Sequence, residues 1–70
     1  MDVIFASHKL NLDAEVKVQR VREHFDALLQ GIQPDIAGGG RYESLTKTKL
    51  EEACMMAVKA IATQPANWLR

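Results

Sequence analysis

The sequence predicts an all-α fold, an antiparallel two-helix hairpin with a short N-terminal segment, assembled as a homo-oligomer. Two stretches repeat apolar residues at alternating intervals of three and four, which is the helical period, and a loop rich in Gly and Pro separates them. The 70 residues allow one domain, residues 1–70. Chains of this size usually need a staple or a partner subunit, and a single cysteine excludes an internal disulfide. Self-association therefore remains as the source of additional burial.

The first helix is expected over residues 12–30. Asn11 can cap it, because an Asn side chain accepts a hydrogen bond from an unpaired amide of the first turn. Gly31 and Pro34 are expected to end it, since both disfavour a helix interior. The residues of its apolar seam are Ala14, Val18, Val21, Phe25, Leu28 and Ile32.

The second helix is expected over residues 41–62, after a loop that contains the triplet Gly38–Gly40. Its apolar stripe comprises Leu50, Cys54, Ala57 and Ile61, widened by Ala53, Met56 and Ala60. Between residues 53 and 61 only Lys59 is polar. A helix that is apolar around most of its circumference is buried on more than one side, so Met55, Met56 and Val58 are expected at an oligomer interface. Single exposure of Met55 or Val58 is the alternative.

Charge and composition argue against several functions. Nine Lys and Arg balance nine Asp and Glu, which disfavours binding of duplex nucleic acid. The longest apolar run is five residues, too short to span a membrane. His8, His24 and Cys54 lack metal-ligand spacing, and no acid/base pair or nucleophile constellation appears. We therefore expect no metal, no cofactor, no catalytic residue and no enzymatic activity.

Two features leave the question of an anion site open. Gly38–Gly40 precede a helix and can present backbone amides to a phosphate, or can simply be a flexible loop. Lys59 lies among apolar neighbours, where it either extends its stem to water or faces a pocket between subunits that accepts an anion.

The stretch 41–62, RYESLTKTKLEEACMMAVKAIA, resembles the second helix of a family of small phage helical-hairpin proteins, which includes the anti-CBASS and Thoeris anti-defence sponges. The shared pattern is an Arg, a Leu, a Thr-x-Leu-Glu run, a small residue, a Met and a basic-Ala-Ile-Ala ending. The preceding helix, with Arg22 and Leu28-Leu29, is similar too, and the resemblance covers roughly residues 8–65.

The resemblance implies a protein that sequesters cyclic oligonucleotide or cyclic ADP-ribose-like immune signals without cleaving them. It implies a homo-oligomer, commonly a hexamer in this family, acting in the host bacterial cytoplasm. A sponge needs cations for phosphates and planar or apolar groups for bases. His8-Lys9 stand where relatives carry a Tyr-Arg pair, and Lys59 stands where they usually carry Arg. The expected ligand-binding residues are His8, Lys9, Arg22, Arg41, Lys47, Thr48 and Lys59.

Two other functions compete with the sponge. One is an oligomeric structural or adaptor protein that binds another protein through its apolar helix face. The other is a small nucleic-acid binder, which zero net charge and the scarcity of Trp and Tyr disfavour. An adaptor does not need Arg22, Arg41 and Lys59 to converge, whereas a sponge does.

Overall fold

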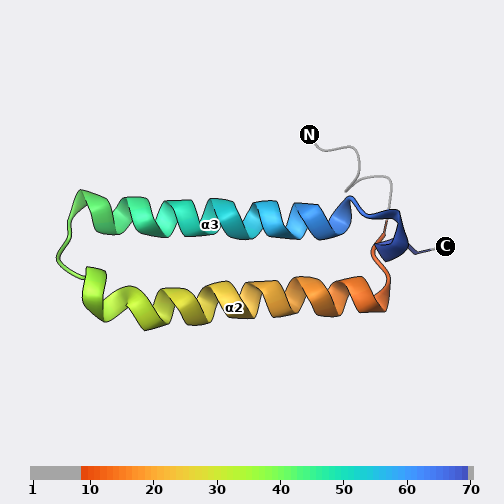
Figure 1. Cartoon of the computed structure of the whole chain (residues 1–70), viewed down its shortest axis with the longest axis horizontal. Helices are drawn as coiled ribbons and strands as arrows, with labels where there is room; N and C mark the ends of the chain where they lie inside the picture. The colour runs from red at the N-terminus through yellow and green to blue at the C-terminus, as the bar shows by residue number, and fades with distance from the viewer. Residues whose placement is uncertain (1–8, 70) are drawn as a thin grey trace.

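The protein is a flat helical hairpin, described here over residues 9–69 by a computed structural model. Helix α2, Leu12–Ile36, and helix α3, Arg41–Ala62, run antiparallel side by side, and the short 3-10 helix η1, Pro65–Asn67, follows (Figure 1). The molecule measures 48 × 24 × 12 Å, and its shortest dimension is about one helix diameter. The hairpin is thus a single layer with two open faces, which confirms the predicted all-α architecture. His8 lies outside the described residues.

The start of α2 follows the sequence prediction. The Asn11 side chain accepts a hydrogen bond from the Ala14 amide at 2.8 Å, so it satisfies one of the unpaired donors of the first turn. Asp13 and Glu15 add negative charge where the helix dipole favours it.

The end of α2 does not follow the prediction. The helix passes Gly31, includes Pro34 and stops only at Ile36. Proline lacks the amide that would continue the hydrogen-bond ladder, but here the loss falls in the last turn. The Gln33 carbonyl still accepts a hydrogen bond from the Ala37 amide, and Ile36 is half-buried against the rest of the hairpin. Contacts with the other helix therefore outweigh the local helix-breaking tendency.

A tight turn joins the two helices. Gly38 and Gly40 have φ angles of 86° and 59°, in the left-handed region that favours glycine. Helix α3 then begins at Arg41 and ends at Ala62, which are the predicted bounds.

The helices pack along the predicted seams with a correction in each helix. In α2, Leu28 is 48% exposed and Leu29 is half-buried in its place. A straight helix has 3.6 residues per turn, so a strict heptad pattern drifts off the contact line, and the seam continues through Leu29, Ile32 and Ile36. In α3 the predicted stripe of Leu50, Cys54, Ala57 and Ile61 is half-buried, whereas Ala53, Met56 and Ala60 are exposed.

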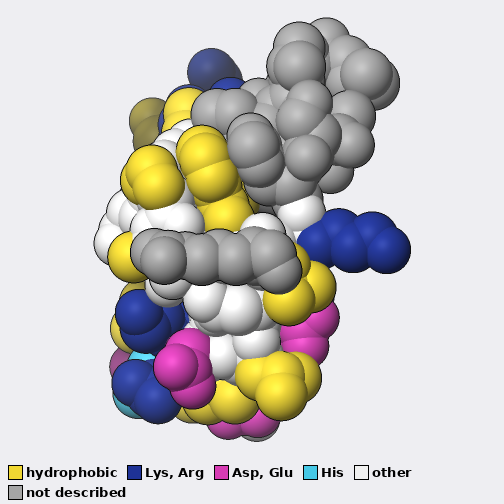
Figure 2. Space-filling view, turned by 90° about the vertical axis from the view of Figure 1, so that its right-hand side faces the viewer, with side chains coloured by type: hydrophobic (Ala, Val, Ile, Leu, Met, Phe, Trp, Pro, Cys, Tyr) yellow, Lys and Arg dark blue, Asp and Glu magenta, His cyan; other side chains and the backbone are white. Residues whose placement is uncertain are grey.

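One hairpin buries little apolar surface. Among residues 9–69, the buried hydrophobic side chains are only Ala14, Val18 and Ala62. Figure 2 shows hydrophobic side chains uncovered at the surface beside charges of both signs. The large exposed ones are Leu12, Val16, Leu28, Tyr42, Leu45, Met55, Met56 and Leu69.

Candidate functional site

Two adjoining grooves bring charged side chains of both helices together. The larger, which we call the α3 groove, has a volume of about 860 Å³. Its apolar lining comes from α3 and consists of Ala53, Cys54, Met55, Met56 and Val58. Its charged lining consists of the cations Arg22, Lys49 and Lys59 and one carboxylate, Glu52. The described lining of this groove therefore carries an excess of positive charge over an apolar surface, which suits an anion with apolar faces.

The smaller groove, which we call the interhelix groove, has a volume of about 190 Å³. Its charged residues are Arg22 and Lys47 against Asp26 and Glu51, so its described charges cancel. Phe25, Leu29, Leu50 and Cys54 complete the described lining. Because Arg22 and Cys54 line both grooves, the two form one surface, and the positive excess lies on the α3 side.

The structure brings some of the predicted ligand residues together and separates others. Arg22 and Lys59 line the α3 groove, and Lys47 lines the adjoining groove. Thr48 is exposed on α3 and lines neither groove. Arg41 lies about 27 Å from Lys59 along the helix, at a rise of ~1.5 Å per residue. Within one protomer these two cations therefore cannot contact the same small ligand.

Lys9 lies outside both grooves. It is exposed and precedes α2, at the end of the hairpin where α3 finishes. Its partner in the predicted pair, His8, lies outside the described residues.

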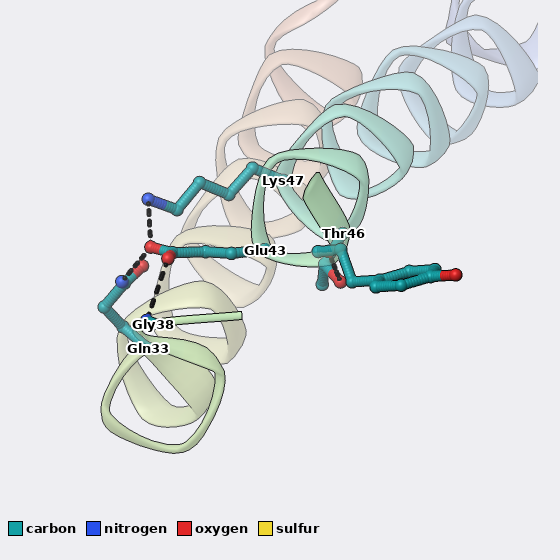
Figure 3. Close-up of polar contacts among 6 residues, drawn as sticks. Gln33, Gly38, Glu43, Thr46 and Lys47 are labelled. Carbon is teal, nitrogen blue, oxygen red and sulfur yellow. Dashed lines mark hydrogen bonds and ion pairs between the residues drawn. The ribbon is translucent and has the colours of Figure 1, made fainter. Parts of the chain in front are cut away.

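Lys47 is held by a carboxylate at the turn end of the hairpin. Its ammonium lies 3.2 Å from Glu43 Oε2, which also accepts a hydrogen bond from the Gln33 amide group at 2.9 Å (Figure 3). The other oxygen of Glu43 accepts a hydrogen bond from the Gly38 amide at 3.2 Å. The hydrogen bonds from Gln33, Lys47 and Gly38 hold the pKa of Glu43 below its ordinary value of 4.5. Lys47 is therefore partly neutralised by its own chain.

The same contacts show what the Gly38–Gly40 triplet does, for which a phosphate site and a flexible loop were the two expectations. The Gly38 amide donates to Glu43, and the Gly39 amide donates to the Ile36 carbonyl at 3.0 Å. A carboxylate of the chain thus occupies the position that an external anion would take at Gly38. The triplet serves to turn the chain and to hold Glu43.

Lys49 and Glu52 are groove residues that sequence reasoning missed. They form an exposed ion pair at 3.5 Å, of the kind that contributes little to stability. Lys49 was visible in the sequence as one of several basic residues of the second helix. Only the path of α3 past Arg22 shows that it lines the groove with Lys59.

Two further kinds of site were considered over the described residues. Within residues 9–69, no three His, Cys, Asp or Glu side chains gather in a way that could hold a metal ion. Over the same range, neither helix carries a stretch apolar enough to cross a bilayer. Cys54 is half-buried between the helices, at the boundary of the two grooves.

Comparison with known proteins places the chain in a family. No curated protein and no solved structure matches the chain. The model of the family described as Acb2/Tad1, hairpin domain, matches residues 8–62, which include both long helices and the turn between them. With that match over most of its length, the chain belongs to the Acb2/Tad1 hairpin-domain family of phage anti-defence proteins.

Proposed function

We propose that this protein is a phage-encoded sponge that binds a cyclic oligonucleotide or a cyclic ADP-ribose-type immune signal without cleaving it. Sequestration of the signal in the host bacterial cytoplasm would block anti-phage defence. The observation that carries the proposal is the α3 groove, in which Arg22, Lys49 and Lys59 line an apolar surface with Met55 and Met56. Cations pair with phosphates, and polarizable thioethers pack against the faces of bases.

In a single chain the α3 groove is open to solvent. We propose that further copies of the chain close it. Met55 is 70% exposed and Met56 67% exposed, while Val58 is half-buried beside them. Ligand sites usually bury most of the ligand surface, which a face of one hairpin cannot do. A homo-oligomer, a hexamer as the resemblance implies, would cover these residues. It would also allow Arg41 of one protomer to approach Lys59 of another.

Calorimetry against cyclic dinucleotides, cyclic trinucleotides and cyclic ADP-ribose isomers tests the proposal. Arg22→Ala and Lys59→Ala should each weaken binding roughly tenfold to a hundredfold, since a charge-assisted contact contributes ~1.5–3 kcal/mol. Arg20→Ala is the matched control, because Arg20 is an exposed cation of α2 that lines neither groove. The recovered ligand should be chemically unchanged. A panel in which nothing binds the unaltered protein would contradict the proposal.

The exposed apolar side chains also support a second candidate, an oligomeric adaptor that binds another protein. Tyr42, Leu45, Met55 and Met56 leave much of α3 uncovered in one hairpin. An adaptor would bind its partner through these residues. Its affinity for that partner would be unchanged by Arg22→Ala and Lys59→Ala. The same pair of variants therefore separates the two functions.

A further inference from the structure

The segment after α3 folds back onto the residues before α2. The Asn11 amide donates to the Asn67 carbonyl at 2.8 Å, and the Leu69 amide donates to the Lys9 carbonyl at 2.7 Å. Leu10 and Trp68 form an isolated antiparallel bridge between these bonds. Figure 1 shows the two stretches meeting at one end of the hairpin. We call residues 65–69 the clasp.

Asn67 anchors the clasp to both helices. Only 3% of Asn67 is exposed, and its Nδ2 donates to the Ile61 carbonyl at 2.9 Å. Its Oδ1 accepts a hydrogen bond from Lys17 Nζ at 3.2 Å. The Trp68 indole donates to the Ala62 carbonyl at 2.7 Å. The clasp therefore gives the Ala62 carbonyl a donor, and it gives the Ile61 carbonyl a second donor beside the Gln64 amide.

The clasp is a feature of this chain beyond what the family match covers. The matched region ends at residue 62, whereas Asn67 and Trp68 follow it. Two of the bonds of the clasp fix the backbone on either side of Leu10. The side chain of Lys9 is exposed there, and Lys59 lies in the last turn of α3 at the same end of the hairpin. Lys9 and Lys59 thus belong to the same end of the hairpin, and the clasp fixes the backbone of Lys9 there.

We propose that Asn67 is a positioning residue that, through the clasp, holds Lys9 at the end of α3 to contact a phosphate of the ligand. The inference rests on the proposed function, because Lys9 is offered as a ligand contact. Asn67 itself touches no ligand. It acts by fixing the backbone of residues 9–11, so that only the side chain of Lys9, and not the backbone that carries it, has to be ordered when the ligand binds.

Amide hydrogen exchange tests the placement of Lys9 without any ligand. Asn67→Ala removes the hydrogen bonds to the Ile61 carbonyl and from Lys17, which anchor the clasp to both helices, so the Asn11 and Leu69 amides should exchange about tenfold faster or more. Asn67→Asp retains the side-chain volume and should act in the same direction, because a carboxylate cannot donate to Ile61. Amides in the middle of α2 report global unfolding and should change less. If all amides accelerate equally, or none does, the clasp does not position residues 9–11 separately from the fold.

Gln64→Ala is the matched control for these exchange measurements. Gln64 is exposed, and its Nε2 donates to the Ala60 carbonyl at 2.9 Å. The variant removes a side-chain hydrogen bond from Gln64, which follows α3, to the last turn of α3. It removes no bond to residues 9–11. Exchange of the Asn11 amide should therefore remain as in the unaltered protein.

A double-mutant cycle tests whether Asn67 acts through Lys9. Calorimetry uses cyclic di-GMP, cyclic tri-AMP and cyclic ADP-ribose as probes. Lys9→Ala and Asn67→Ala should each weaken binding about tenfold, and the double variant should lose no more than either single variant. If the loss of affinity in the double variant equals the product of the two single losses, the inference is wrong even if the sponge function is right. If no probe binds the unaltered protein, the proposed function fails, whereas the exchange of the Asn11 amide still decides whether Asn67 places Lys9.

Discussion

Replacing Asn11 with Ala removes two hydrogen bonds at the start of α2. The Oδ1 atom of Asn11 caps the helix by accepting from the Ala14 amide, and Nδ2 donates to the Ala66 carbonyl at 3.0 Å. One side chain thus joins the helix terminus to the clasp. The backbone bond from the Asn11 amide to Asn67 remains in the variant, so the loss belongs to the side chain alone.

The expected loss follows from the two bonds. Removing an N-cap costs about 1 kcal/mol. The bond to Ala66 is exposed, so its net contribution is at the low end, about 0.5 kcal/mol. Asn11→Ala should therefore lower the free energy of unfolding by about 1.5 kcal/mol. In a domain of this size that corresponds to a fall in Tm of roughly 6–12 °C.

Asn11→Asp separates the two bonds, because it retains the capping oxygen and loses only the Nδ2 donor. Its added charge is favourable at a helix N-terminus, so its Tm should stay within about 4 °C of the unaltered protein. Thermal unfolding followed by circular dichroism gives both values. The protein concentration must be the same throughout, since self-association raises Tm. If Asn11→Ala leaves Tm unchanged, or Asn11→Asp falls as far as Asn11→Ala, the cap does not stabilise the hairpin.

Three further predictions concern the turn, the seam and the assembly. The lowered pKa of Glu43 stabilises the fold above pH 4.5, and this contribution is lost as the pH falls through the lowered value. The Tm gap between the unaltered protein and Glu43→Gln should therefore shrink on acidification, and a gap independent of pH would contradict the assignment. Leu29→Ala should lower the free energy of unfolding, measured with urea, by about 2 kcal/mol, and Leu28→Ala should lower it by less than about 1 kcal/mol. Equal losses would place both residues on the seam. On the proposed assembly, Met55→Glu should reduce the particle mass in light scattering, because a buried carboxylate without a partner is costly, and an unchanged mass would place the interface elsewhere.

The helical hairpin could be predicted from local features of the sequence. The cap at Asn11 and the bounds of α3 at Arg41 and Ala62 agree with the structure, because capping groups and apolar spacing act within a few residues. The resemblance of residues 41–62 to a phage family is confirmed by the family match. These features depend on side chains close together in the chain.

The length of α2 and the course of its apolar seam were not predicted correctly from these local features. The helix continues through Pro34, and Gln33 near its end bonds to Glu43 of the other helix. Leu29 replaces Leu28 at the contact because the helix drifts relative to a heptad repeat. The end of α2 depends on a contact with α3 that helix propensity does not report, whereas the course of the seam depends on the helical period of 3.6 residues, which a heptad pattern does not follow.

The candidate site depends on tertiary structure to a greater extent. Charge pattern and resemblance selected Arg22 and Lys59, but only the antiparallel pairing of α2 and α3 places them on one groove and adds Lys49. Within α3, Arg41 lies at the opposite end from Lys59, and Lys47 pairs with Glu43 one turn away. Composition and periodicity determine that this chain forms two amphipathic helices with a turn between them, because those properties act locally. Which cations meet, and which segment holds the chain ends together, depends on contacts between residues such as Lys17 and Asn67, which lie far apart in the sequence and meet only once the hairpin has closed.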